Sequence, residues 1–182
     1  MFNSLLEHLP ADEILEQLDK LDSEHSLREF IKCAWHVLEP KRKFTPGWHI
    51  DAVCDALTAV SKGHIKRLVI GEPPGCMKSL TTDVFYPAHE WGPLNMPAMR
   101  YVSASYSQDI TIRDNRRTRA LIASPWYQRL WGDRFSLQPD QNAKTRFDND
   151  KTGFKIATSV GGLGTGERGD RFIIDDPHNI KD

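Results

Sequence analysis

The chain has only three cysteines, and none of them belongs to a pair. Cys33, Cys54 and Cys76 lie far apart and form no C-x-x-C motif. This spacing argues against a zinc site and against a disulfide framework, and it is typical of a protein from a reducing cytoplasm. The seven histidines also lack a ligand spacing such as H-x-x-x-H, so they indicate no metal site of their own.

Long hydrophobic runs are missing as well. No stretch approaches the roughly 18 apolar residues of a membrane span. The N-terminal segment "MFNSLLEHLPADEILEQLDK" carries acidic residues where a signal peptide needs a positive region. We therefore expect a soluble protein that is not exported and has no membrane partner.

An excess of charge of either sign is also absent. The 182 residues include 24 Lys and Arg against 25 Asp and Glu, so a nucleic-acid partner would have to be met by a local patch. Apolar residues make up 39% and charged residues 27%, which is ordinary for a globular chain. The length fits one domain with a hydrophobic core.

The first forty residues are predicted to form a helical lead-in. Ser26 and Glu29 make a capping box before "LREFIKCAWHVLE", and Pro40 ends that helix. A further helix is expected to begin with Thr45 as its N-cap and Pro46 as its first residue.

The rest of the chain alternates between strand and helix patterns. Strands are predicted at 65–70 and 99–105, a hairpin at 144–160, and a final buried strand in "RFIIDD". Helices are predicted from Lys78, disturbed at Pro87, then over 108–123, and in a short segment after Pro125. This order predicts an α/β fold with a partly parallel sheet flanked by helices, and ligands at the carboxyl ends of the strands.

The loop "EPPGCMKSL" after the first predicted strand raises the question of a phosphate-binding loop. The G-x-x-x-x-G-K-[ST] template, aligned on Lys78 and Ser79, places Glu72 and Met77 where its glycines should be. A side chain at the second position must point away from the phosphates. One interpretation is therefore only a Pro-Gly turn before a helix that begins with lysine.

The other interpretation is a phosphate loop built from different residues. Lys78 and Ser79 open a predicted helix directly after a strand, where a lysine reaches the outer phosphates and a hydroxyl binds Mg²⁺. Gly71 and Gly75 give the backbone freedom, and Pro74 stiffens the entry.

Paired carboxylates at the end of the last strand favour the functional interpretation. In "DRFIIDDPH", Asp175 is placed to hold Mg²⁺ through water or the Ser79 hydroxyl, and Asp176 to orient an attacking water as a general base. The alternative is a turn after a strand. Two such motifs at the ends of two strands in one α/β domain are less expected by coincidence.

Residues 164–169, "GTGERG", match the dinucleotide fingerprint G-x-G-x-x-G in letters only. That fingerprint must open a helix, whereas this one runs into a strand pattern. We interpret 161–170 as a loop near the γ-phosphate with Arg168 as a charge-stabilising residue, or else as a solvated loop.

Two further features leave their alternatives open. Arg113, Arg116 and Arg117 share a helix face that is either solvated surface or a contact for DNA phosphates or a neighbouring subunit's nucleotide. Trp48 and His49 precede the first strand and either stack on an adenine ring or belong to the core.

Taken together, three segments resemble the ATPase domain of tailed-phage terminase large subunits, the motors that package viral DNA. They are "PPGCMKSLTTDVFYPAHEWG", "RYVSASYSQDITIRDNRRTRALIASPWYQRLWGD" and "GFKIATSVGGLGTGERGDRFIIDDPHN". The resemblance covers most of the chain from about residue 40. One branch of that family replaces the usual phosphate loop with P-P-G-x-M-K-S, so the missing glycines look like a family variant.

The resemblance implies an ASCE-type P-loop NTPase that uses ATP and Mg²⁺. Pro74, Gly75, Cys76, Met77, Lys78 and Ser79 then correspond to Walker A, and Asp175 with Asp176 to Walker B and its catalytic acid. Trp48 and His49 stand where the family often has a glutamine for adenine. The implied partners are double-stranded DNA, the terminase small subunit, the portal protein and further copies of the chain, in the host cytoplasm.

The chain also departs from that family. Residues 1–40 form the lead-in and 41–182 the ATPase domain, but nothing corresponds to the usual nuclease domain, so no nuclease activity is expected. A later strand that the family places between the Walker A and Walker B strands is missing too. The edges of the first and last predicted strands should then face a gap, and the resulting exposed apolar surface predicts low stability or self-association.

Three hypotheses follow from the sequence. The first is an ATP-driven DNA-packaging motor subunit, which in isolation can bind ATP without turning it over. The second is a truncated, inactive prophage remnant that acts only by binding other terminase subunits or the portal. The third, another P-loop enzyme such as a helicase or a small-molecule kinase, would need motifs that the sequence lacks.

Overall fold

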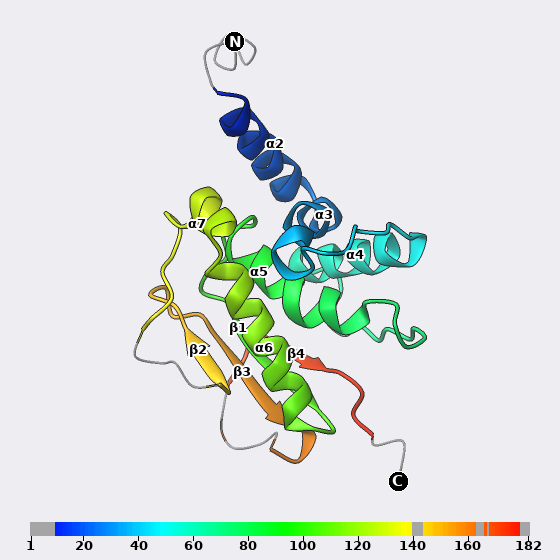
Figure 1. The fold of residues 1–182 in the computed structure, drawn as a ribbon. Helices are drawn as coiled ribbons and strands as arrows, with labels where there is room; N and C mark the ends of the chain where they lie inside the picture. Colours follow the sequence, from blue (N-terminus) through cyan, green and yellow to red (C-terminus); the bar gives the residue numbers. More distant parts are fainter. Residues whose placement is uncertain (1–9, 140–143, 163–165, 167, 179–182) are drawn as a thin grey trace.

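The computed structural model describes residues 10–139, 144–162, 166 and 168–178 (Figure 1). This part of the chain has an α/β fold, with six α-helices and a four-stranded sheet in the order β2-β3-β1-β4. Within these described ranges, no helix is long and apolar enough to cross a membrane.

The sheet is mixed but largely parallel. β1 (Arg100–Ser105) is central and runs parallel to both β3 (Phe154–Ser159) and β4 (Arg171–Ile174). β2 (Arg146–Asp148) pairs antiparallel with β3, which confirms the predicted hairpin. The carboxyl ends of the three parallel strands therefore meet at one edge of the sheet.

The N-terminal region is helical, as the sequence predicts. α2 (Ala11–His25) projects from the body of the molecule in Figure 1, and α3 (Leu27–Leu38) follows it directly. The predicted cap is confirmed, because the Ser26 hydroxyl accepts a hydrogen bond from the Glu29 amide at 3.1 Å. α4 (Trp48–Ser61) begins later than predicted, with Gly47 and not Thr45 as its N-cap.

A continuous helix over residues 78–91 runs through the middle of the protein. Its first turn is α-helical, η1 (Leu80–Phe85) is a π-helix, and α5 (Tyr86–Trp91) returns to α-helical geometry. Every residue from Thr81 to Trp91 is buried. The predicted disturbance at Pro87 is thus a π-turn that precedes the proline, which lies in the first turn of α5.

α6 (Gln108–Ile122) packs on β1 and β3 and also against η1. α7 (Pro125–Trp131) follows, and the Ser124 side chain caps it as the Ser-Pro pair predicts. The core between these helices is rich in aromatic residues, and Phe30 of α3 is fully buried at its centre. The Phe30 ring contacts the rings of Phe85, His89, Trp126, Tyr127 and Trp131.

The first predicted strand is wrong. Residues 65–70 form no strand: in the described part of the chain the sheet ends at β4, and this segment pairs with none of its strands. The period-2 alternation of a strand persists: Leu68 and Ile70 pack against the core, while Val69 is 96% exposed. The segment therefore has the apolar alternation of a strand, but within the described residues it has no partner for ladder hydrogen bonds.

The last predicted strand exists but is not buried. β4 lies at the edge of the sheet, with Phe172 57% exposed and Ile174 54% exposed. A cavity of about 740 Å³ lies between β4 and residues 65–70 and is lined by both segments. The expectation of exposed apolar surface at this place is confirmed.

Candidate functional site

The loop before the buried helix has an unusual backbone. Gly75 has φ +87° and Met77 has φ +67°, so both lie in the left-handed region that favours glycine. Met77 tolerates this conformation while its side chain packs against the hydrophobic core. The side chain thus points away from the loop, as a phosphate loop would require at this position.

The structure brings Lys78 and Ser79 together with the two aspartates after β4. Lys78 Nζ lies 3.0 Å from Asp175 Oδ1 and 2.7 Å from Asp176 Oδ1. The Ser79 hydroxyl donates a hydrogen bond to Asp175 Oδ2. Four residues that are almost one hundred positions apart in the sequence therefore form one cluster at the carboxyl end of the sheet.

The backbone of β1 fixes the two aspartates. The Asp175 amide donates to the Ala104 carbonyl at 2.9 Å, and the Tyr106 amide donates to the Asp176 carbonyl at 3.1 Å. Asp176 itself has φ +44°, so the chain turns sharply directly after Asp175. The two carboxylates consequently leave the strand end in different environments.

The two carboxylates differ in how far they are exposed to solvent. The Asp175 side chain is 9% exposed, whereas that of Asp176 is 64% exposed. The pKa of Lys78 is raised, mainly by its hydrogen bond to Asp176 and to a lesser extent by its contact with Asp175. The Lys78 ammonium group therefore stays charged. Asp175 is the fixed member of the pair, and Asp176 faces solvent.

The donor set suits a hard divalent cation. The Ser79 hydroxyl and the Asp175 carboxylate are adjacent oxygen donors, and Mg²⁺ is commonly held by one or two such groups together with waters and substrate phosphates. Among the described residues, no three or more His, Cys, Asp or Glu side chains are grouped so that they could hold a metal ion. A cation here would complete its shell with waters or phosphate oxygens.

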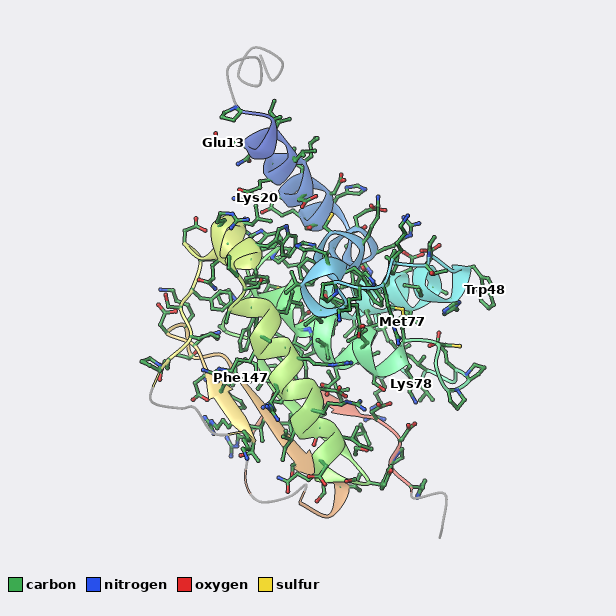
Figure 2. The ribbon with its side chains drawn as sticks, viewed as in Figure 1. Glu13, Lys20, Trp48, Met77, Lys78 and Phe147 are labelled. Atoms are coloured by element: carbon green, nitrogen blue, oxygen red, sulfur yellow. The ribbon has the colours of Figure 1, made fainter. Side chains whose placement is uncertain are left out.

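The other predicted site residues lie farther from this cluster or make no contact with it. Trp48 is 82% exposed at the start of α4, and its ring lies against the His49 ring, with centroids 6.3 Å apart. Figure 2 shows Trp48 at the outer end of α4 and Lys78 at the start of the buried helix. In the described ranges no hydrogen bond, ion pair or ring contact joins Trp48 or His49 to the loop, and the adenine role stays a prediction.

The loop that carries Arg168 is described only in part. Residues 163–165 and 167, which include three of the six residues of the "GTGERG" match, lie outside the described residues. Arg168 is exposed and makes no ion pair with any described residue, so its predicted role near a γ-phosphate stays a prediction. Pro74 and Cys76 lie in the loop itself, and the Cys76 amide donates to the Pro73 carbonyl at 3.4 Å.

The arginine face of α6 is only partly free. The Arg113 guanidinium donates two hydrogen bonds to its neighbour Asp114, at 2.8 and 2.9 Å. Arg117 Nη2 lies 3.5 Å from Glu39 Oε1, while Arg116 is exposed. This face is therefore mostly a set of intramolecular ion pairs at the surface.

A buried ion pair near the cluster escaped the sequence analysis. Asp83 in η1 and Lys155 in β3 are 2% and 0% exposed, and Lys155 Nζ lies 3.1 Å from Asp83 Oδ1. The available signal was a lysine in the strand "FKIATS" and an aspartate in the apolar helix "LTTDVF". Charges in such segments are almost never buried unless they are paired.

Comparison of the chain with protein-family models, with curated proteins and with solved structures found no match.

Proposed function

We propose that this chain is the ATPase part of a DNA-packaging motor of the tailed-phage terminase type, built as an ASCE-type P-loop NTPase. The observation that carries the proposal is the meeting of Lys78 and Ser79 with Asp175 and Asp176. A lysine and a hydroxyl at a helix start, opposite paired carboxylates at a strand end, are the groups that nucleotide hydrolysis needs.

Each residue has a chemical task in this proposal. Lys78 would bind the outer phosphates, and Ser79 and Asp175 would hold Mg²⁺, which neutralises the developing negative charge when bound. In the present structure Lys78 Nζ lies 2.7 Å from Asp176 Oδ1. When the Lys78 ammonium group binds phosphate oxygens instead, the Asp176 carboxylate would be free to accept a proton from water. The left-handed Met77 keeps its side chain away from the phosphate position.

The proposed partners belong to the motor and not to the isolated chain. They are double-stranded DNA, the terminase small subunit, the portal protein and further copies of the chain. Arg116, and Arg113 once released from Asp114, are candidates for phosphate contacts in such an assembly.

A second candidate is a chain that binds Mg²⁺-ATP without turning it over. The observation in its favour is Asp176, whose short side chain is largely solvated and paired with Lys78. A general base must reach its water within hydrogen-bond distance. A carboxylate that bulk water surrounds orients no single water molecule by itself.

The test is thermal unfolding with and without Mg²⁺-ATP, combined with a phosphate-release assay. Saturation at about 100 times the dissociation constant should add roughly 2.7 kcal/mol to the free energy of unfolding of the wild type. Lys78→Ala should abolish this gain. Lys32→Ala, which removes a lysine paired with Glu29 at 2.9 Å outside the site, should keep it.

The outcomes separate the candidates. Stabilisation that depends on Lys78, together with phosphate release, supports the ATPase. Stabilisation without phosphate release supports nucleotide binding alone. No stabilisation of the wild type by Mg²⁺-ATP would overturn both.

A further inference from the structure

The buried ion pair between Asp83 and Lys155 joins the helix that carries Lys78 and Ser79 to the sheet. Asp83 follows Ser79 by four residues in the same helix, and Lys155 comes from β3 on the other side of β1. The Ser103 hydroxyl on β1 donates a further hydrogen bond to the Asp83 carboxylate. One side chain of η1 is thereby tied to two strands of the sheet.

Burial of this pair is not explained by stability. Removing two charges from water costs free energy that their attraction seldom exceeds, so an apolar pair of similar volume would serve the core as well. A buried ion pair has a better-attested use, which is to select one arrangement of neighbouring elements.

The element that the pair contacts has an uncommon helical register. η1 is a π-helix, a rare register in which backbone hydrogen bonds join residues five apart and not four, and such turns are frequent at functional sites. Its backbone accommodates Pro87, which has no N–H to offer to the carbonyl of Asp83. That carbonyl instead accepts from Thr118 Oγ1 of α6 at 3.1 Å.

The register of η1 determines where Lys78 and Ser79 point. Both residues are α-helical and directly precede the π-turn, and Thr82 Oγ1 in η1 donates to the Lys78 carbonyl at 2.9 Å. A change from π to α register would rotate these two residues relative to α5. The Lys78 and Ser79 side chains would then no longer face Asp175.

We propose that Asp83 is a positioning residue: its ion pair with Lys155 holds the π-turn, and the π-turn aims Lys78 and Ser79 at the carboxylates after β4. The role in nucleotide binding rests on the proposed function. The placement of Lys78 against Asp175 and Asp176 does not, since it is a property of the protein alone.

The test removes the pair without leaving an unpaired charge. In the double variant Asp83→Leu/Lys155→Met the core stays apolar and is expected to fold, as circular dichroism and a cooperative unfolding transition would verify. Two readouts follow: the dissociation constant for Mg²⁺-ATP, and the rate at which acetic anhydride acetylates Lys78, measured by peptide mass spectrometry relative to Lys32.

The positioning role predicts at least a tenfold weaker Mg²⁺-ATP affinity and a several-fold faster acetylation of Lys78, because its ammonium group loses its two carboxylates. The control Glu24→Gln/Arg134→Met removes an ion pair between α2 and the segment after α7. It should change neither readout. If the first double variant does not fold, Thr118→Val carries the test. It removes no charge, and it removes the Thr118 hydroxyl that hydrogen-bonds to the Asp83 carbonyl and, within its own helix, to the Asp114 carbonyl.

The results decide the inference and the proposed function separately. A folded variant with unchanged acetylation of Lys78 and unchanged affinity overturns the positioning role. Faster acetylation of Lys78 supports it even if the wild type binds no Mg²⁺-ATP, and in that case only the proposed function fails.

Discussion

Breaking the Asp83–Lys155 pair from one side should be among the most damaging single changes in the protein. The Asp83 carboxylate is 2% exposed, and Lys155→Met leaves it, among the described residues, with the Ser103 hydroxyl as its one side-chain partner. An unpaired buried charge costs about 3–5 kcal/mol. For a chain of this length, that loss corresponds to a fall in Tm of about 6–20 °C.

The cost of Lys155→Met should also depend on pH. Burial raises the pKa of Asp83, and the attraction of Lys155 opposes this shift, so loss of Lys155 raises the pKa further. A carboxyl group whose pKa is higher in the folded than in the unfolded protein binds more protons when folded. The folded variant therefore gains stability as the pH falls, and the penalty should shrink between pH 7 and pH 5.

The assay is urea unfolding, followed by circular dichroism at several pH values, for Lys155→Met, for Asp83→Leu and for the double variant Asp83→Leu/Lys155→Met. The double variant should lose less free energy than Lys155→Met alone. The reasoning is refuted if Lys155→Met costs less than about 1 kcal/mol at pH 7, or if the double variant costs as much as the sum of its two single changes.

Three further predictions concern other parts of the fold. His89 is buried, and burial lowers its pKa to about 4. As the pH drops from 6.5 to 4, the unfolded chain binds the proton before the folded chain does, so the free energy of unfolding should fall by about 3 kcal/mol. In His89→Phe, the free energy of unfolding should change less with pH over this range. The exposed edge of β4 should cause self-association in analytical ultracentrifugation, which Phe172→Lys together with Ile174→Lys should suppress, and a monodisperse wild type at high concentration would contradict this. Gly75→Ala meets no atom within 4 Å but should still cost roughly 1–2 kcal/mol in thermal unfolding, because φ is +87°, and an unchanged Tm would show that the loop relaxes.

Local signals in the sequence predicted most elements of the fold. Capping residues identified the starts of α3 and α7, and the hairpin of β2 with β3 followed from its turn. The start of α4 was misplaced because Thr45 and Pro46 also form a plausible cap, and Gly47 takes that role in the structure. Such errors concern boundaries, where competing caps differ little in free energy.

The strand at 65–70 could not be judged from its own residues. Its apolar alternation is real, as the exposure of Val69 between two core-facing residues shows. A strand also requires a partner to satisfy its ladder hydrogen bonds, and whether a partner is present depends on the rest of the sheet. The same applies to β4, whose apolar sequence predicted a buried strand although it lies at an edge.

The candidate site was predictable because its members follow directly from secondary structure. Lys78 and Ser79 begin a helix and Asp175 ends a strand, so the α/β topology alone places them together. The register of η1 was not predictable. We attribute it to contacts with Lys155 of β3 and Thr118 of α6, which are distant in sequence. The apolar periodicity within residues 78–91 does not distinguish a π-turn from an α-helical turn.

The unequal burial of the two aspartates suggests why a nucleotide could enter a site that is already closed by ion pairs. The contact between Lys78 and Asp176 involves a carboxylate that is 64% exposed, and exposed ion pairs contribute only about 0–1 kcal/mol. Charge-assisted hydrogen bonds to a phosphate are stronger and would displace it. Asp175 is 9% exposed and accepts from Ser79 as well, so it would keep its place while Lys78 turns to the phosphates. Under the proposed function, Asp175 would hold the cation and Asp176 would be released for water. In Asp175→Asn nucleotide binding should then become independent of Mg²⁺, whereas Asp176→Asn should bind Mg²⁺-ATP as well as the wild type does.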